Sequence, residues 1–186
     1  MRQIEPLRRI RILLAVFITG LVLSGITAFP LQTELGWLDS ILHADALLPI
    51  AESTGLLIWI TRVHSAVATT NTQFPFLAYG TDWLAFAHLI LAILFIGPFV
   101  DPVRNKWVIT FGLIACAGVF PLALIAGPIR GIPLGWRLID CSFGIFGAIP
   151  LFLCRCLIQR LEACAPVQRS HPGAHAGPHP AVQNTL

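Results

Sequence analysis

Long apolar runs alternate with short polar stretches along the chain, and this alternation predicts its elements. Four runs approach the ~20 residues that a helix needs to cross a bilayer core about 30 Å thick, because a helix rises about 1.5 Å per residue. These runs cover residues 12–29, 82–100, 107–127 and 136–153. The pattern therefore predicts an all-α fold, a four-helix transmembrane bundle built as a single membrane domain over residues 1–164.

The composition agrees with a chain that is largely surrounded by lipid. Of the 186 residues, 56% are hydrophobic and 11% are charged, whereas a soluble domain has about 25% charged residues. The net charge of +3 is spread along the chain and forms no basic stripe with interleaved aromatic rings, which excludes a nucleic-acid-binding protein. The expected partners are the lipid bilayer and either other membrane-protein subunits or further copies of the chain, as a homo-oligomer.

The basic residues predict the orientation, because cytoplasmic loops of membrane proteins are enriched in Lys and Arg. If the N-terminus is cytoplasmic, three of the 12 basic residues lie outside, namely Arg62, Arg130 and Arg137. The remaining nine then lie inside: Arg2, Arg8, Arg9, Arg11, Arg104, Lys106, Arg155, Arg160 and Arg169. Both termini are therefore predicted to be cytoplasmic.

Residues 30–80 form an extracytoplasmic segment between the first two spans. A segment of that length without structure of its own is uncommon in compact folds. Apolar residues recur at helical spacing within it, which predicts an amphipathic helix over residues 54–70 and a shorter one over residues 36–48. The apolar positions of the longer helix are Leu56, Ile60, Val63 and Val67, opposite Thr61, Arg62 and Ser65.

Two alternative topologies are weaker. A fifth span over residues 55–79 would bury Arg62, which costs about 2.5–3.5 kcal/mol at a helix centre. Cleavage of the first span as a signal peptide needs a small residue three positions from the cut, and the best site, after Ala28, has Ile26 there. Residues 165–186, rich in Pro, Gly, Ala and His, predict a disordered cytoplasmic tail.

Every span also carries a stripe of small residues. Such residues let helix backbones approach one another in lipid, where no hydrophobic effect drives association. The stripes predict a tightly packed bundle. They consist of Gly20, Ser24 and Ala28; Ala85 and Ala92; Gly112, Ala115 and Cys116; and Gly144, Gly147 and Ala148.

Two ionisable residues lie within the spans, where each is costly and needs a partner. His88 and Asp140 follow an interfacial tryptophan by five and four residues, so both lie ~6–7.5 Å below that ring on ideal helices. Each shares a helical face with small residues and should point into the bundle. We expect one hydrogen-bond network around them, and its candidate members are His88, Asp140, Arg137 and Asp82.

This candidate site has a structural and a functional interpretation. A structural network would lock helix pairing. A functional site would handle protons or bind a ligand such as a quinone, since histidine changes charge near neutral pH. A haem held by two histidines would need His64 opposite His88, but surface positions explain His64 and His43 more simply, and no cofactor is expected.

The cysteines and the tail histidines do not predict a metal site. The C-x-C spacing at the predicted cytoplasmic end of the last span differs from that of structural zinc sites, and reduced thiols are expected there. Pro and Gly interrupt any helix that would align the tail histidines. The residues concerned are Cys154, Cys156, Cys164, His171, His175 and His179.

No phosphate-binding Gly loop, nucleophile elbow or HExxH helix is found, so an enzyme is not expected. The stretch from Asp82 to His88, continued by residues 97–105, resembles uncharacterised small multi-pass membrane proteins of bacteria. The resemblance implies a bacterial cytoplasmic membrane and no activity. Three functions stay open: a non-enzymatic binding or accessory subunit of a membrane complex, a redox or proton-handling subunit that binds quinone or haem near His88, and a small transporter, although no internal repeat is evident.

Overall fold

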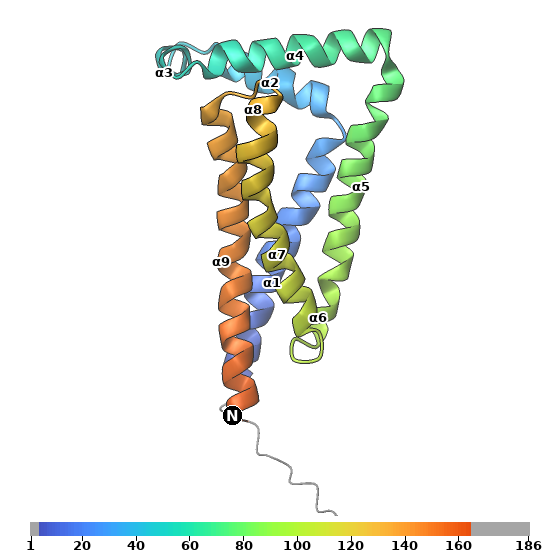
Figure 1. The fold of residues 1–186 in the computed structure, drawn as a ribbon, viewed down its shortest axis with the longest axis vertical. Coiled ribbons are helices and arrows are strands. Elements are labelled where there is room, and N and C mark those ends of the chain that lie inside the picture. Colours follow the sequence, from blue (N-terminus) through green and yellow to red (C-terminus); the bar gives the residue numbers. More distant parts are fainter. Residues whose placement is uncertain (1–3, 165–186) are drawn as a thin grey trace, which may run out of the picture.

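The computed structural model describes residues 4–164 as a helical molecule (Figure 1). In chain order its helices are α1 (Ile4–Ala28), α2 (Leu31–Leu42), α3 (Leu48–Ser53), α4 (Leu56–Gln73), α5 (Tyr79–Leu94), α6 (Ile96–Val100), α7 (Lys106–Pro121), α8 (Gly127–Ile129) and α9 (Leu134–Cys164). A 3₁₀ turn, η1 (Pro75–Leu77), precedes α5, and a π-helical turn, η2 (Leu122–Ala126), joins α7 to α8. Residues 4–164 contain no strand, which confirms the predicted all-α fold.

Four helical stretches are long and apolar enough to cross a bilayer, as the sequence predicts. They cover Glu5–Ala28, Pro75–Val100, Lys106–Ile129 and Leu134–Ala163. The last one extends well past the predicted boundary at residue 153, because Ile158 still packs in the bundle core. Cys154 is therefore buried inside α9, where its thiol donates to the Ile10 carbonyl at 3.7 Å, and not at a fraying helix end. The predicted tail, residues 165–186, lies outside the described residues.

Proline interrupts the helical hydrogen bonding in two spans. Pro98 has no N–H to donate to the Leu94 carbonyl, and α5 ends at Leu94 before α6 begins. Pro121 closes α7, and the chain continues as the π-helical turn η2. Both departures from a continuous α-helix therefore occur at a proline.

Asp101 and Pro102 belong to a turn that precedes α7. The Asp101 carboxylate accepts a hydrogen bond from the Arg104 backbone N–H at 3.0 Å, which forms a turn. The side-chain amide of Asn105 donates to the Gly97 carbonyl at 3.1 Å and to the Asp101 carbonyl at 2.9 Å. These bonds tie the turn back to α6, so that α7 begins only at Lys106.

The spanning helices pack as two pairs that meet at the end carrying the N-terminus. α7 packs along α9, and α1 packs with both α5 and α9. Toward the other end, α1 and α5 lean away from α7 and α9 (Figure 1). The main core lies in the half where the pairs meet, and its buried members are Ile10, Leu14, Phe95, Ile109, Cys116, Leu151, Cys154 and Ile158.

Small residues set the close approach of α7 and α9. A Cβ on Gly144 would lie 2.8 Å from the Cys116 carbonyl oxygen, and one on Gly112 would lie 2.7 Å from Cδ1 of Leu151. On α1 the predicted stripe is wrong in detail, because a Cβ on Gly20 would have no neighbour within 4 Å. Gly25 packs on α5 instead, and its Cβ would lie 3.0 Å from the Ala85 carbonyl oxygen.

Residues 31–77, here called the cap, cross the end of the bundle opposite the N-terminus (Figure 1). α4 packs against α2 and covers residues 56–73, close to the predicted 54–70. It buries Ile60 and exposes Thr61, Arg62 and Ser65, which confirms the amphipathic pattern. The second cap helix is displaced: residues 36–42 belong to α2, residues 43–47 form a turn, and α3 begins at Leu48. Pro49 lies in the first turn of α3, where proline is favoured.

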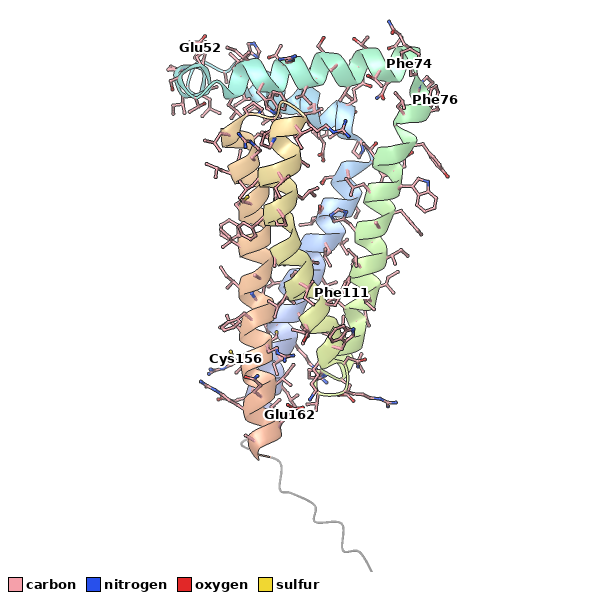
Figure 2. The ribbon with its side chains drawn as sticks, in the orientation of Figure 1. Glu52, Phe74, Phe76, Phe111, Cys156 and Glu162 are labelled. Atoms are coloured by element: carbon pink, nitrogen blue, oxygen red, sulfur yellow. The ribbon has the colours of Figure 1, made fainter. Side chains whose placement is uncertain are left out.

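Aromatic rings mark the corner between the cap and α5. Figure 2 shows Phe74 and Phe76 at this corner, at the far end of α4 from Glu52. The two rings meet edge to face with their centroids 6.2 Å apart. Both side chains are exposed, so this corner presents an apolar surface.

Candidate functional site

His88 lies on the face of α5 that packs against α1. The neighbouring positions on this face, Ala85 and Ala92, are buried, and His88 itself is half-buried. Its Nδ1 lies 2.8 Å from the Leu84 carbonyl oxygen one turn earlier. With the proton on Nδ1, this bond leaves Nε2 as the acceptor atom of the ring.

Asp140 lies in the second turn of α9, on the stripe that continues with Gly144 and Gly147. The side chain is half-buried, and Gly147 on the same stripe faces α1, where its Cβ would lie 3.5 Å from the Phe17 ring. Within residues 4–164 the Asp140 carboxylate accepts no hydrogen bond and forms no ion pair. A carboxylate at such a position is costly unless a partner or water offsets the charge.

Arg137 lies one turn before Asp140 and packs against α8. A Cβ on Gly127 would lie 2.5 Å from the Arg137 Cδ and 2.8 Å from its Cγ, so the glycine makes room for this side chain. The Arg137 Nε is buried without a hydrogen-bond partner. Asp82, in the first turn of α5, is half-buried. Arg137 is thus positioned by the end of the third span, a contact that the sequence alone does not predict.

The four predicted site residues are not joined directly. In the part of the chain that the structure describes, no hydrogen bond or ion pair links His88, Asp82, Asp140 and Arg137 to one another. Two belong to α5 and two to α9, and the pairs containing these helices diverge toward the cap. The common network around His88 and Asp140 therefore stays a prediction.

A polar cluster in the cap was not foreseen from the sequence. The Thr61 hydroxyl donates to the Asp39 carboxylate at 2.5 Å, and the Nδ1 atoms of His43 and His64 each lie 3.8 Å from that carboxylate. The His64 ring also faces Gly36, whose Cβ would lie 3.4 Å from Nε2. The i,i+4 spacing of Asp39 and His43 was the available signal. His64 is thus engaged with α2, and no three side chains of residues 4–164 are grouped to hold a metal ion.

A second set of polar contacts joins α7 to α9 at the opposite end. Arg155 donates to the Thr110 hydroxyl at 2.6 Å, and the Lys106 ammonium lies 2.8 Å from the Glu162 carboxylate. Glu162 lies near the end of α9 (Figure 2). Lys106, Arg155 and Glu162 border a cavity of about 70 Å³, which is too small for anything but water or an ion. The contacts therefore hold the two helices together.

An apolar cavity of about 410 Å³ lies between the cap and the first turns of α9. Trp59 of α4 and Trp136 of α9 line it, together with residues of α2 and α3. Trp136 also packs on the small apolar core of the cap. The lining offers apolar contact and no catalytic group.

Comparison of the chain with known protein families, curated proteins and solved structures finds no match.

Proposed function

We propose that the chain is a multi-pass membrane protein that acts by binding, as a non-enzymatic accessory subunit of a membrane complex. Both termini lie in the cytoplasm and the cap lies outside. The observation that carries the proposal is the position of the core, which ends midway along the bundle. In the half of the bundle near the cap, α1 packs with α5 and α7 packs with α9. A transmembrane helix of a partner protein binds between these two pairs.

The face of α1 supports this proposal. Leu13 and Phe17 pack on the core, and steps of three and four residues continue the same face to Gly20 and Ser24. Gly20 and Ser24 are exposed, and a Cβ on Gly20 would have no neighbour within 4 Å. Exposed small residues four positions apart let another helix backbone approach closely, which is a main source of helix association in lipid.

The polar groups on α9 support it as well. Asp140 has no hydrogen-bond donor within residues 4–164, and the buried Nε of Arg137 has no acceptor. A partner helix with a hydroxyl or amide side chain would supply a donor to the half-buried Asp140 carboxylate, since polar side chains join helices in membranes. That hydrogen bond would set the orientation of the partner.

The test places a photo-crosslinking residue at Ser24 in the full chain, in its native membrane. The control position is Ile26, which is exposed to 54% and lies ~200° around the helix from Ser24. We expect one discrete protein adduct from Ser24 and none from Ile26. Gly20→Leu should reduce the Ser24 adduct about tenfold or more and leave the Tm of the purified chain unchanged, because no neighbour of Gly20 has to move.

Two outcomes would overturn the accessory-subunit proposal. One is a protein that always runs as a free monomer in native mass analysis and yields only lipid adducts from Ser24. The other is an adduct of two copies of this chain, which would make the face a homo-oligomer interface.

A second candidate is a redox or proton-handling subunit that binds a quinone or haem at His88. The hydrogen bond from Nδ1 to the Leu84 carbonyl favours it, because histidines that bind metal commonly donate their other ring N–H to such a carbonyl. The visible spectrum and the organic extract of the purified protein separate the candidates. A Soret band or a co-extracted quinone that disappears in His88→Ala would support this function, and the absence of both signals would exclude it.

A further inference from the structure

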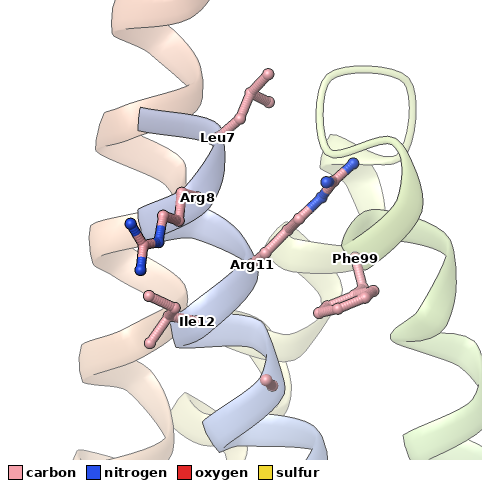
Figure 3. A pocket seen from close by; sticks show the side chains of 6 residues that line it. Leu7, Arg8, Arg11, Ile12 and Phe99 are labelled. Atoms are coloured by element: carbon pink, nitrogen blue, oxygen red, sulfur yellow. The ribbon is translucent and has the colours of Figure 1, made fainter. Parts of the chain in front are cut away.

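A cleft of about 600 Å³ opens between α1 and α6, at the end of the bundle opposite the cap. It is lined by Leu7, Arg8, Arg11, Ile12, Ala15 and Phe99 (Figure 3). Apart from the two arginines, its walls are apolar. The cleft begins among the first turns of α1 and continues along the part of the helix that enters the span.

The two arginines border the cleft on different sides. Figure 3 shows Arg11 extending from α1 toward the loop after α6, beside Phe99, whereas Arg8 extends to the other side, next to Ile12. Both side chains are exposed, and within residues 4–164 neither guanidinium has a hydrogen bond or an ion pair. By contrast, Arg9 lies 4.0 Å from the Glu5 carboxylate.

We propose that this cleft binds one anionic phospholipid, with its phosphate between Arg8 and Arg11 and an acyl chain along Ile12, Ala15 and Phe99. Guanidinium groups form strong charge-assisted hydrogen bonds with phosphate, and basic pockets between spanning helices bind anionic headgroups. Ala15 lies one turn, or ~6 Å, deeper than Arg11, so the apolar wall runs toward the bilayer centre below the charges.

The orientation of the chain in the membrane does not by itself explain why Arg8 and Arg11 border an apolar cleft. The positive-inside rule requires only that basic residues lie near the ends of the spans, and Arg104 and Arg160 meet that requirement outside the cleft. The cleft adds an apolar wall directly beneath two arginines that have no carboxylate partner in the described chain. The proposal rests on the bundle spanning a bilayer and does not depend on a partner helix.

The experiment measures lipid binding to the purified full chain by native mass spectrometry. Dioleoylphosphatidylglycerol is compared with dioleoylphosphatidylcholine and with glycerol 3-phosphate. We expect one phosphatidylglycerol to bind at least tenfold more tightly than phosphatidylcholine, and no competition by glycerol phosphate at equal concentration. The double variant R8Q/R11Q should weaken that binding about 30-fold, since each basic residue near the surface contributes about fivefold.

The matched control is R9Q/R160Q, which removes the same charge from exposed positions at the same end and should change the affinity less than twofold. Ala15→Trp fills the apolar wall and keeps both arginines, so it should also weaken phosphatidylglycerol binding at least tenfold. Equal losses in the two double variants would overturn the proposal, as would unchanged binding in Ala15→Trp. Full competition of glycerol 3-phosphate with phosphatidylglycerol would also overturn the proposal, because it would show a site for a free phosphate and not for a lipid. If R8Q/R11Q does not fold, phosphatidylglycerol binding to the Ala15→Trp variant tests the proposal by itself.

Discussion

Single glycines determine how closely the spanning helices approach. Gly144 lies against the Cys116 backbone, Gly112 against the Phe95 ring and Gly127 against the Arg137 side chain. In each case a methyl group would meet atoms closer than 3.0 Å. Glycines elsewhere on the same helices, such as Gly118, have open space around them. A glycine on α7 can therefore be required for close packing, as Gly112 is, or have room for a larger side chain, as Gly118 does.

We predict that Gly144→Ala destabilises the protein. The added Cβ would meet the Cys116 carbonyl at 2.8 Å, and a backbone atom cannot move aside as a flexible side chain can. Overpacking of this kind typically costs about 1–3 kcal/mol. Thermal unfolding in detergent measures the change, with Gly118→Ala as the control, which should be neutral or stabilising by up to about 1 kcal/mol. Equal Tm values for the two variants would show that α7 and α9 are not in contact at Gly144.

We predict that Asp140→Asn leaves the isolated protein as stable as the parent or up to about 1 kcal/mol more stable. The side chain has no partner in the described chain that would be lost, and an ionised carboxylate in a span is costly. Unfolding in detergent is the measurement, and Asp45→Asn on the exposed cap surface controls for the charge change. A decrease of more than about 1 kcal/mol in the free energy of unfolding would reveal an intramolecular partner of Asp140 and would support the predicted network with His88.

At the scale of the element, the length of α9 organises the bundle. Its 31 residues correspond to ~46 Å at ~1.5 Å per residue, against a bilayer core of about 30 Å. The helix is therefore longer than a bilayer core requires, and near its end Glu162 meets Lys106. Its deeper part carries Leu151 and Cys154 in the core.

The hydrogen bond between Arg155 and Thr110 yields a prediction about the α7–α9 pair. Thr110→Val removes the hydroxyl that accepts from Arg155 at 2.6 Å. Hydrogen bonds to charged groups contribute about 1.5–3 kcal/mol, but Arg155 is partly exposed and water replaces part of the bond, so the expected loss is about 1 kcal/mol. Thr69→Val, which loses only a bond to its own helix, should cost less when both are measured by chemical unfolding. The opposite order would contradict this assignment.

Hydropathy and periodicity predict the elements well and their contacts poorly. The number of long apolar helices and the amphipathic face of α4 follow from the spacing of apolar residues alone. The end of α9 does not, because the residues beyond 153 are more polar and are kept helical by packing of Ile158. The contacts of Asp39 with His64 and of Arg137 with Gly127 depend on how helices cross, which no local pattern encodes. For the same reason, the face that each residue shares with small residues predicts the direction of His88 and Asp140 but does not determine whether the two side chains form a bond.

At the scale of the whole molecule, the basic residues predict which end of the bundle faces the cytoplasm. Cysteines introduced one at a time at exposed cap positions, such as Ser40, Asp45 and Ser65, should react with an impermeant thiol reagent in intact cells. Sites at Val103 and Gln159, at the opposite end, should react only after the membrane is opened. Protection of the cap positions in intact cells would reverse the topology.

The divergence of the two helix pairs also bears on the shape of the surrounding membrane. A body that is narrow where α6 and the start of α1 meet and broad beneath the cap occupies unequal areas in the two leaflets of a bilayer. Lipids fit around such a wedge with least strain where the broad side faces the stretched, convex leaflet. The protein would therefore be enriched in regions of the membrane that bulge toward the cap and depleted from regions that bend the other way.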